Sequence, residues 1–278
     1  MWGMHRGLRI SKVFVGCLAL FFGACEERRA EPAAPSMASQ AQPAKDTQSK
    51  QNSSSPKKPS APAPALEAAG IRYLEIVTKS ADSNAELPLI IAIHGLGDRP
   101  EGFADLIQNF ERPARFILPQ GLYAHHGGFS WFPFGLGLLH PDTEAGIRTA
   151  ARKLSEAIAI ISTSRPTKNK AIVTGFSQGG ALSFAIALFH PDTVSAAFPI
   201  GGWIASPLPS ELPKSAPSLV ALHGEADTLI PIQPTKQAVM RLSEMGWKAE
   251  LRPFAGVSHS VPAGMQRELF GLLESAIR

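Results

Sequence analysis

Cysteine is almost absent from this sequence, and the positions of the few cysteines exclude several kinds of site. The only two cysteines, Cys17 and Cys25, both lie near the N-terminus of the 278-residue chain. The rest of the chain therefore has no thiol, so it can form neither a disulfide nor a thiolate metal site. Its sequence therefore does not indicate whether that region works in an oxidising or a reducing compartment.

A basic surface is also missing from the part of the chain expected to fold. The whole sequence has a net charge of +4, but residues 67–278 contain 18 basic and 19 acidic side chains, which leaves that region at −1. The positive charge lies in residues 1–66. Nucleic-acid binding needs basic residues clustered on one face, so the composition argues against a nucleic-acid partner.

No long apolar run is present at the N-terminus. Residues 1–24 have a basic start, an apolar run from Val13 to Phe22 and then Gly23 and Ala24, a pattern typical of an export signal. The run is about half the roughly 20 residues that a membrane-spanning helix needs. A permanent transmembrane anchor is therefore the weaker alternative.

The end of this signal suggests a lipid anchor. Phe22-Gly23-Ala24-Cys25 resembles a bacterial lipobox, in which the cysteine is lipidated and becomes the mature N-terminus. Phe22 stands where leucine is usual, and Cys17 is the poorer candidate because it interrupts the apolar run. The resemblance implies an exported lipoprotein, held through Cys25 in a membrane on the periplasmic or outer face of a bacterial envelope.

Large apolar residues are scarce in residues 25–66, which are dominated by proline, alanine and serine. Such a segment cannot bury enough surface to fold. A flexible coil of about 40 residues spans roughly 35 Å, which suits a tether between an anchor and a domain. A disordered tail without a tethering role is the alternative, and the cysteine at its head favours the tether.

Residues 67–278 alternate apolar strands with helices, which predicts an α/β domain with a mostly parallel sheet covered on both faces. Ligands of such sheets bind outside the carboxyl ends of the strands, so the loops there are the candidate site. The predicted strands are 71–77, 87–93, 115–118, 171–174, 195–200, 218–223 and 248–254, and the predicted helices are 143–162, 181–189, 233–245 and 265–277.

The most informative of these loops is Gly175-Phe176-Ser177-Gln178-Gly179-Gly180, between a predicted strand and a predicted helix. Glycines let strand and helix approach closely around a serine in an unusual backbone conformation. The helix start behind the serine favours negative charge that develops beside the hydroxyl. Ser177 is therefore a candidate nucleophile, although a glycine-rich turn here is also an ordinary structural solution.

A serine nucleophile needs a histidine base that is oriented by a carboxylate. Asp227 and His259 lie on later strand-end loops, and the chain order Ser, Asp, His is the one expected for an α/β-hydrolase. Asp227 could instead cap its own turn, and Glu225 competes with it for the role of the acid. His259 is the only histidine after the last predicted strand.

The other histidines carry weaker signals. His94 and His223 precede glycines at strand ends, where histidines more often hold loops by hydrogen bonds than act in catalysis. His125-His126 has no third ligand at metal-binding spacing. The sequence therefore predicts neither a metal nor a cofactor.

Four motifs together resemble the phospholipase/carboxylesterase family, which includes the acyl-protein thioesterases. They are His94-Gly95-Leu96-Gly97-Asp98, the sequence GFSQGG from Gly175, the HGxxD-type stretch from His223, and Gly256 to His259, in the family's order over nearly all of 70–278. The resemblance implies an α/β-hydrolase fold without a cofactor. It also implies Ser177 as nucleophile, Asp227 as acid, His259 as base, and an oxyanion hole from the backbone N–H groups of Leu96 and Gln178.

The substrate is expected to meet an aromatic loop, 121–139. Trp131 and Phe132 in this loop are predicted to form an apolar wall for an acyl group, although such aromatics can also only pack the loop down. Pro133 stands where the family often has aspartate, which argues against thioesterase-like recognition. Only 17 residues, 201–217, separate the strands after Ser177, so no cap domain fits and an open site is expected.

The sequence thus predicts a serine esterase that cleaves accessible small-molecule carboxylic esters through an acyl-enzyme, with thioesters left open as a further substrate class. Two alternatives remain open. One is a serine peptidase or polyester depolymerase on the same fold, and the other is a surface lipoprotein that keeps the fold as a binding module.

Overall fold

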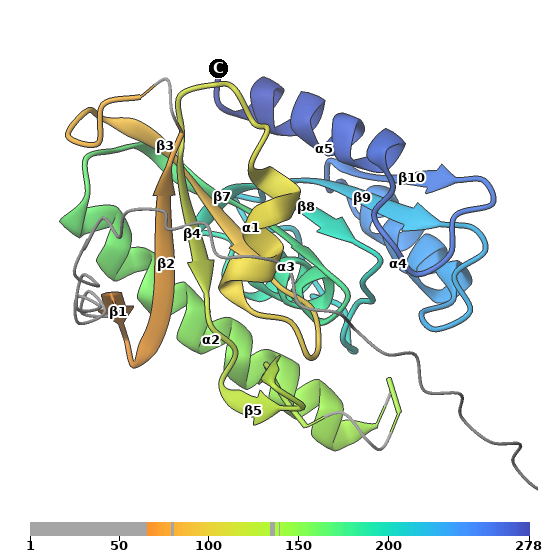
Figure 1. Cartoon of the computed structure of the whole chain (residues 1–278). Coiled ribbons are helices and arrows are strands. Elements are labelled where there is room, and N and C mark those ends of the chain that lie inside the picture. Colours follow the sequence, from red (N-terminus) through yellow and green to blue (C-terminus); the bar gives the residue numbers. More distant parts are fainter. Residues whose placement is uncertain (1–65, 79–80, 134–136, 139) are drawn as a thin grey trace, which may run out of the picture. The chain divides into compact units, whose positions relative to one another are not determined.

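The computed structural model describes residues 66–78, 81–133, 137–138 and 140–278 (Figure 1). The predicted export signal, Cys25 and almost all of the predicted tether lie outside these residues. The first strand begins at Leu66, one residue inside the segment predicted to be the tether.

An eight-stranded sheet forms the centre of the domain, in the order β1-β2-β4-β3-β7-β8-β9-β10. The six strands from β4 to β10 in this order are parallel, and β2 pairs antiparallel with both β1 and β4. The predicted, mostly parallel sheet is therefore confirmed. The strands are β1 (Leu66–Ala68), β2 (Ile71–Val77), β3 (Leu87–Ile93), β4 (Arg115–Pro119), β7 (Thr167–Phe176), β8 (Val194–Ile200), β9 (Ser218–Gly224) and β10 (Ala249–Phe254).

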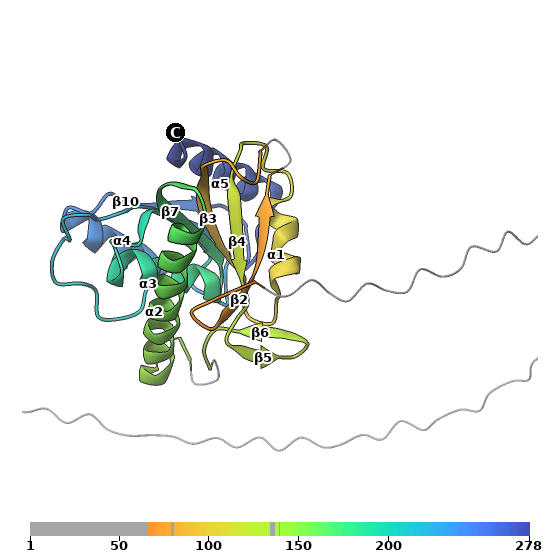
Figure 2. The ribbon, with the colours of Figure 1, turned by 90° about the vertical axis from the view of Figure 1, so that its left-hand side faces the viewer.

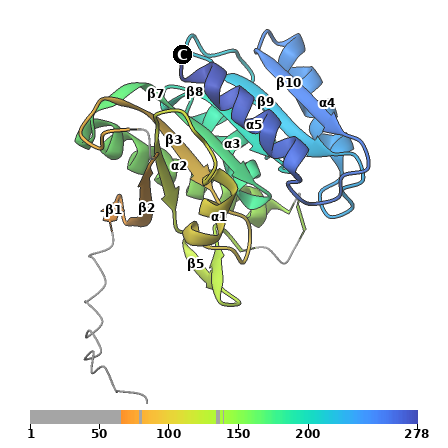
Figure 3. The same cartoon turned by 45° about the horizontal axis from the view of Figure 1, so that its top comes forward.

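Helices cover both faces of the sheet, as predicted (Figures 2 and 3). The side chains of α2, α3 and α4 pack on one face, and those of α1 and α5 pack on the other. These helices are α1 (Pro100–Ile107), α2 (Pro141–Ser164), α3 (Gln178–Phe189), α4 (Ile232–Glu244) and α5 (Ala263–Ala276).

The central strands are apolar on both sides because each side lies in a core. In β3, Leu89, Ile91 and Ile93 belong to the core with α2 and α3, whereas Ile90 and Ala92 belong to the core with α1 and α5. Alternate side chains of a strand point to opposite faces. This placement explains why β3 is a continuous apolar run, and it holds the carboxyl ends of the central strands in fixed positions.

Three described features were not predicted from the sequence: β1, α1 and the hairpin of β5 (Tyr123–His125) and β6 (Gly128–Ser130). The strands β1, β5 and β6 have three residues each, too few for a clear alternation pattern. Helix α1 has eight residues and contains Gly102, a poor helix former. Its burial of Phe103 and Ile107 against the sheet stabilises it instead.

No cap covers the carboxyl edge between β8 and β9. The connecting segment 201–217 is described throughout and contains no helix or strand, as its length predicted. Within the described ranges, every helix is too short or too polar to cross a membrane.

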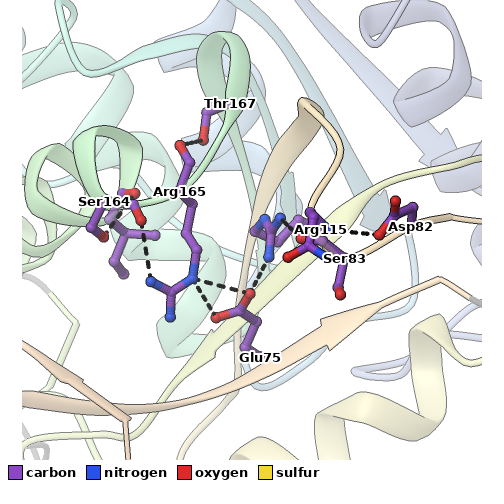
Figure 4. A network of polar contacts seen from close by, with 9 residues as sticks. Glu75, Asp82, Ser83, Arg115, Ser164, Arg165 and Thr167 are labelled. Carbon is purple, nitrogen blue, oxygen red and sulfur yellow. Dashed lines mark hydrogen bonds and ion pairs between the residues drawn. The ribbon is translucent and has the colours of Figure 1, made fainter.

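A partly buried ion-pair cluster joins the sheet to the end of α2 (Figure 4). Glu75 on β2 accepts hydrogen bonds from the guanidinium groups of Arg115 on β4 and Arg165 after α2, the latter at 3.0 Å. Arg115 also donates to the carbonyl oxygen of Ser83, at 2.7 Å. Because the side chain of Arg115 is only 2% exposed, its charge depends on Glu75 for compensation.

Glu75→Ala is therefore expected to lower the free energy of unfolding by about 3–5 kcal/mol, since it leaves a buried arginine without its counter-charge. Urea unfolding measures this loss. Glu156→Ala is the matched control, because Glu156 pairs with Arg152 on the exposed surface of α2. The control should change the free energy of unfolding by less than about 1 kcal/mol. Equal, small effects of the two substitutions would contradict the prediction.

Candidate active site

Ser177 occupies a strained turn between β7 and α3. Its φ is 57° and its ψ is −115°, a conformation that non-glycine residues rarely adopt. The turn depends on a close approach to β3, because a Cβ on Gly179 would lie 2.0 Å from the carbonyl oxygen of Ile93. The predicted strand–turn–helix geometry is therefore present, with Ser177 at its apex.

The three candidate residues Ser177, His259 and Asp227 form one hydrogen-bonded chain. The Ser177 Oγ lies 2.9 Å from His259 Nε2, and His259 Nδ1 lies 2.7 Å from Asp227 Oδ2. Because the carboxylate can only accept at that oxygen, Nδ1 carries the proton and Nε2 keeps a lone pair for the serine hydroxyl. The geometry supports the pairing that the sequence predicted.

Asp227, and not Glu225, is the carboxylate in this chain. The Asp227 side chain is 1% exposed, and its Oδ1 accepts hydrogen bonds from the backbone N–H groups of Leu229 at 3.0 Å and Ile230 at 2.8 Å. These bonds hold the second oxygen toward His259. Glu225 is exposed and lies outside the pocket at Ser177.

The predicted oxyanion donors also reach this pocket. Leu96 and Gln178 line the same cavity of about 260 Å³ as Ser177 and His259. Neither backbone N–H donates a hydrogen bond to another residue in the part of the chain that the structure describes. For Gln178 this follows from its place as the first residue of α3, where an N–H has no partner within the helix.

Trp131 and Phe132 do not form the predicted wall of this pocket. They are 0% and 1% exposed and belong to the core between the sheet and α2, so an acyl group cannot contact them without displacing the core. The predicted contact of these two residues with substrate is therefore corrected. An indole or phenyl ring in a glycine-rich loop is also stabilised when it is buried in the core. The alternative, that these aromatics pack the loop down, describes the structure.

The apolar wall comes from residues that sequence reasoning missed. Trp203 and Ile230 line the pocket at Ser177 and also a neighbouring, larger cavity of about 590 Å³. That second cavity is bounded mainly by apolar residues, including Leu138 and Ile204. Trp203 lies in the loop after β8 and Ile230 in the loop after β9. This position after a strand end is the sequence feature that could have identified them as pocket residues.

His94 and His223 hold loops, as predicted. The Gly121 N–H donates to His94 Nε2 at 3.0 Å, so His94 Nδ1 carries the proton and donates to the Gly95 carbonyl oxygen at 2.7 Å. The His223 Nε2 lies 2.8 Å from the Ile230 carbonyl oxygen. In the described ranges, His125 and His126 belong to no group of three or more metal-ligating side chains.

Burial should make the fold sensitive to acid through these two histidines. Desolvation lowers the pKa of His94 and of His223 below the ordinary value of 6.5. Below pH 6.5 the unfolded chain binds protons that the folded chain does not, so acid favours unfolding. The free energy of unfolding should fall as the pH drops below 6.5, by up to about 1.4 kcal/mol per pH unit for each histidine.

Urea unfolding at pH 7.5, 6.5 and 5.5 tests this expectation. His94→Gln should reduce the pH dependence below 6.5, because it removes one of the histidines whose pKa burial lowers; His190 is a further one. Equal stability of the unsubstituted chain at pH 7.5 and 5.5 would refute it.

Solved structures share this fold over most of the chain. The crystal structure of esterase PE8 superposes with a TM-score of 0.63 at 22% identity, over 74% of this chain and 99% of that protein. The crystal structure of Arabidopsis thaliana SOBER1 superposes with a TM-score of 0.60 at 21% identity, over 69% of this chain and 99% of that one. At these identities the likeness concerns the α/β-hydrolase fold.

Sequence relatives are similarly distant. Carboxylesterase SOBER1 of Arabidopsis thaliana is 26% identical over 191 residues, which are 62% of this chain and 83% of that protein. Acyl-protein thioesterase 1 of Gibberella zeae is 25% identical over 196 residues, again 62% of this chain and 83% of that protein. The sequence profile of the Phospholipase/Carboxylesterase family matches residues 73–273. Because this match spans nearly all of the folded domain, the chain belongs to the Phospholipase/Carboxylesterase family, as its motifs predicted.

Proposed function

We propose that this chain is a serine esterase that hydrolyses carboxylic esters through an acyl-enzyme, with Ser177, His259 and Asp227 as its catalytic triad. The observation that carries the proposal is the hydrogen-bonded chain of these three residues, at 2.9 and 2.7 Å. Beside it lie two backbone N–H groups that donate to no other residue within the described ranges. Membership of an esterase family and relatives named carboxylesterase and acyl-protein thioesterase support it.

Acylation begins when the Ser177 Oγ attacks the ester carbonyl carbon. His259 Nε2 takes the hydroxyl proton, and the Asp227 carboxylate stabilises the imidazolium through Nδ1–H. The carbonyl oxygen becomes an oxyanion that accepts hydrogen bonds from the N–H groups of Leu96 and Gln178. When the tetrahedral intermediate collapses, the C–O bond to the alcohol breaks and His259 returns the proton to the leaving oxygen.

Deacylation repeats these steps with water. His259 Nε2 takes a proton from the water, whose oxygen attacks the acyl carbon and forms a second oxyanion in the same hole. Collapse breaks the bond to Ser177, which recovers its proton from His259, and the carboxylic acid leaves. The residues needed for both half-reactions are all on this chain.

The substrate we propose is an accessible ester with an uncharged acyl group. Trp203 and Ile230 give the pocket an apolar side that continues into the larger cavity, and no cap lies between β8 and β9. Cleavage of thioesters is the less favoured part of the proposal, since Pro133 stands where the family often has a carboxylate.

Hydrolysis of p-nitrophenyl acetate, butyrate and octanoate by the full chain tests the proposal. We expect turnover of at least one of these esters. The ester should be cleaved faster than the p-nitroanilide that has the same acyl group. Preferential cleavage of the anilide would favour a peptidase instead. Absence of turnover, together with no labelling of Ser177 by a fluorophosphonate, would favour the binding-module alternative.

We further propose that the chain is exported and anchored in a bacterial envelope through lipidated Cys25. The lipobox-like sequence at residues 22–25 supports this proposal. In bacterial cells, labelling with a fatty-acid analogue should be lost in Cys25→Ala and kept in Cys17→Ala. Unchanged labelling of Cys25→Ala would refute the anchor.

A further inference from the structure

One buried residue, Trp131, bonds to both arms of the proposed oxyanion hole, to one through its side chain and to the other through its backbone. The Trp131 indole Nε1–H donates a hydrogen bond to the carbonyl oxygen of His94 at 3.0 Å. The backbone N–H of the same residue donates to the side-chain oxygen Oε1 of Gln178, also at 3.0 Å. His94 follows the end of β3, and Gln178 begins α3 just after β7. Trp131 therefore links the two strand ends that supply the donors.

The first arm runs through the His94 ring. Its Nδ1–H donates to the carbonyl oxygen of Gly95 at 2.7 Å. That carbonyl belongs to the same peptide group as the N–H of Leu96, and in a trans peptide the two point in opposite directions. A ring that holds the Gly95 oxygen on one side therefore aims the Leu96 N–H to the other side. The rings of His94 and Trp131 also pack together, with centroids 5.2 Å apart.

The second arm runs through the Gln178 side chain. Besides the Trp131 N–H, its Oε1 accepts from the hydroxyl of Ser130 at 3.2 Å, and its Nε2 donates to the carbonyl oxygen of Phe132 at 3.4 Å. Gln178 is 1% exposed. Its side chain is thus anchored in residues 130–132, and Gln178 also lines the pocket at Ser177.

We infer that Trp131 is a positioning residue that sets the separation and direction of the two oxyanion donors, Leu96 and Gln178. The inference rests on the proposed function, because the proposed ester hydrolysis gives these two N–H groups the role of oxyanion donors. It assigns Trp131 a part in the reaction that needs no contact with substrate. Only proline would remove a backbone donor, and it would also change the backbone conformation, so the residue that aims the donors is the accessible point of intervention.

The expected effect is on catalysis and not on substrate binding. Loss of an entire oxyanion-hole donor costs about 10²–10³-fold in kcat. A donor that remains but is less well aimed should cost less, so we expect about a 10–100-fold loss. Because the ester carbonyl carries little negative charge before attack, KM should change by less than about threefold.

Trp131→Phe tests this inference, because it removes the indole N–H and keeps a large aromatic ring in the site. Trp247→Phe is the matched control. Trp247 is also buried, at 3% exposure, in the same core, but its Nε1–H has no hydrogen-bond partner among the described residues. The same substitution there loses packing without losing such a bond, so kcat should stay within about threefold of the unsubstituted chain.

A tetrahedral inhibitor gives a readout that a merely structural role would not move. A trifluoromethyl ketone with a butyryl-like chain forms an oxyanion adduct with Ser177. Its inhibition constant should rise in Trp131→Phe in proportion to the loss of kcat/KM for p-nitrophenyl butyrate. In Trp247→Phe the inhibition constant should stay unchanged.

Gln178→Met carries the test from the other arm, including the case in which Trp131→Phe does not fold. It removes the side-chain acceptor and keeps the backbone N–H. We expect it to lower kcat about tenfold. The double variant should lose less than the product of the two single losses, because each substitution removes one of the two hydrogen bonds through which residue 131 connects the donors.

The outcomes separate the inference from the proposed function. Equal kcat losses in Trp131→Phe and Trp247→Phe, or a loss confined to KM, overturn the positioning role while the esterase stands. For a Trp131→Phe that does not fold, an unchanged kcat in Gln178→Met overturns it in the same way. An unsubstituted chain without esterase activity overturns the proposed function and the positioning role together.

Discussion

Ser177→Ala is expected to lower kcat/KM for p-nitrophenyl butyrate by 10³-fold or more. The substitution removes the oxygen that we propose forms the acyl-enzyme, while the proposed oxyanion donors and the pocket remain. Removal of the nucleophile from a catalytic triad lowers the catalytic rate about 10³–10⁶-fold, and a small residual rate remains from substrate binding and electrostatic stabilisation. The folded structure should persist, since alanine keeps the Cβ that the turn already accommodates. Steady-state kinetics with purified chains measure the loss.

Ser195→Ala provides the control for this prediction. Ser195 lies near the start of β8, away from the pocket, and its hydroxyl donates to the backbone at Lys170. Its activity should match the unsubstituted chain within about twofold. A Ser177→Ala chain that retains a tenth or more of the activity would mean that the nucleophile lies elsewhere.

Asp227→Asn is expected to lower kcat by about 10⁴-fold at neutral pH, with little change in KM. An asparagine side chain can keep its oxygen toward the N–H groups of Leu229 and Ile230, which leaves its NH₂ group facing His259. That group donates, so it favours the His259 tautomer with the proton on Nε2, which cannot accept from Ser177. The loss should therefore appear in kcat, measured at saturating ester.

Glu225→Gln is the matched control, because Glu225 lies two residues away and is exposed. Its kcat should stay within about twofold of the unsubstituted chain. A large loss in Glu225→Gln and a small one in Asp227→Asn would assign the acid role to Glu225, against the geometry.

The positions of the candidate triad could be predicted because each member follows a strand. Parallel strands place their carboxyl ends at one edge of the sheet, so the loops that hold Ser177, Asp227 and His259 had to converge. The glycines around Ser177 identified the turn, since backbone contacts as close as that of Gly179 with β3 leave no room for a side chain. The choice between Asp227 and Glu225 needed the structure, because two carboxylates so close in sequence differ only in direction.

The directions of the aromatic rings of Trp131 and Phe132 could not be predicted either, because sequence position does not fix which way a side chain points. A glycine-rich loop lets a ring turn toward solvent or into the core, and its burial depends on whether a distant partner is present. For Trp131 that partner is the carbonyl oxygen of His94. The short α1 was missed because its stability comes from contacts with β3 and β4 that no local pattern records.

The strand order has a consequence for the folding rate. The neighbours β3 and β7, at the middle of the sheet, pair Leu87 with Thr167, so the chain between them must close a long loop before this pairing forms. Such non-local pairing is slow because the entropy of loop closure is lost before contacts compensate for it. Residues from the loops after β3, β7, β9 and β10 meet only once all these strands are in place. Recovery of ester hydrolysis after dilution from urea therefore reports the last steps of refolding, behind the recovery of helical circular dichroism.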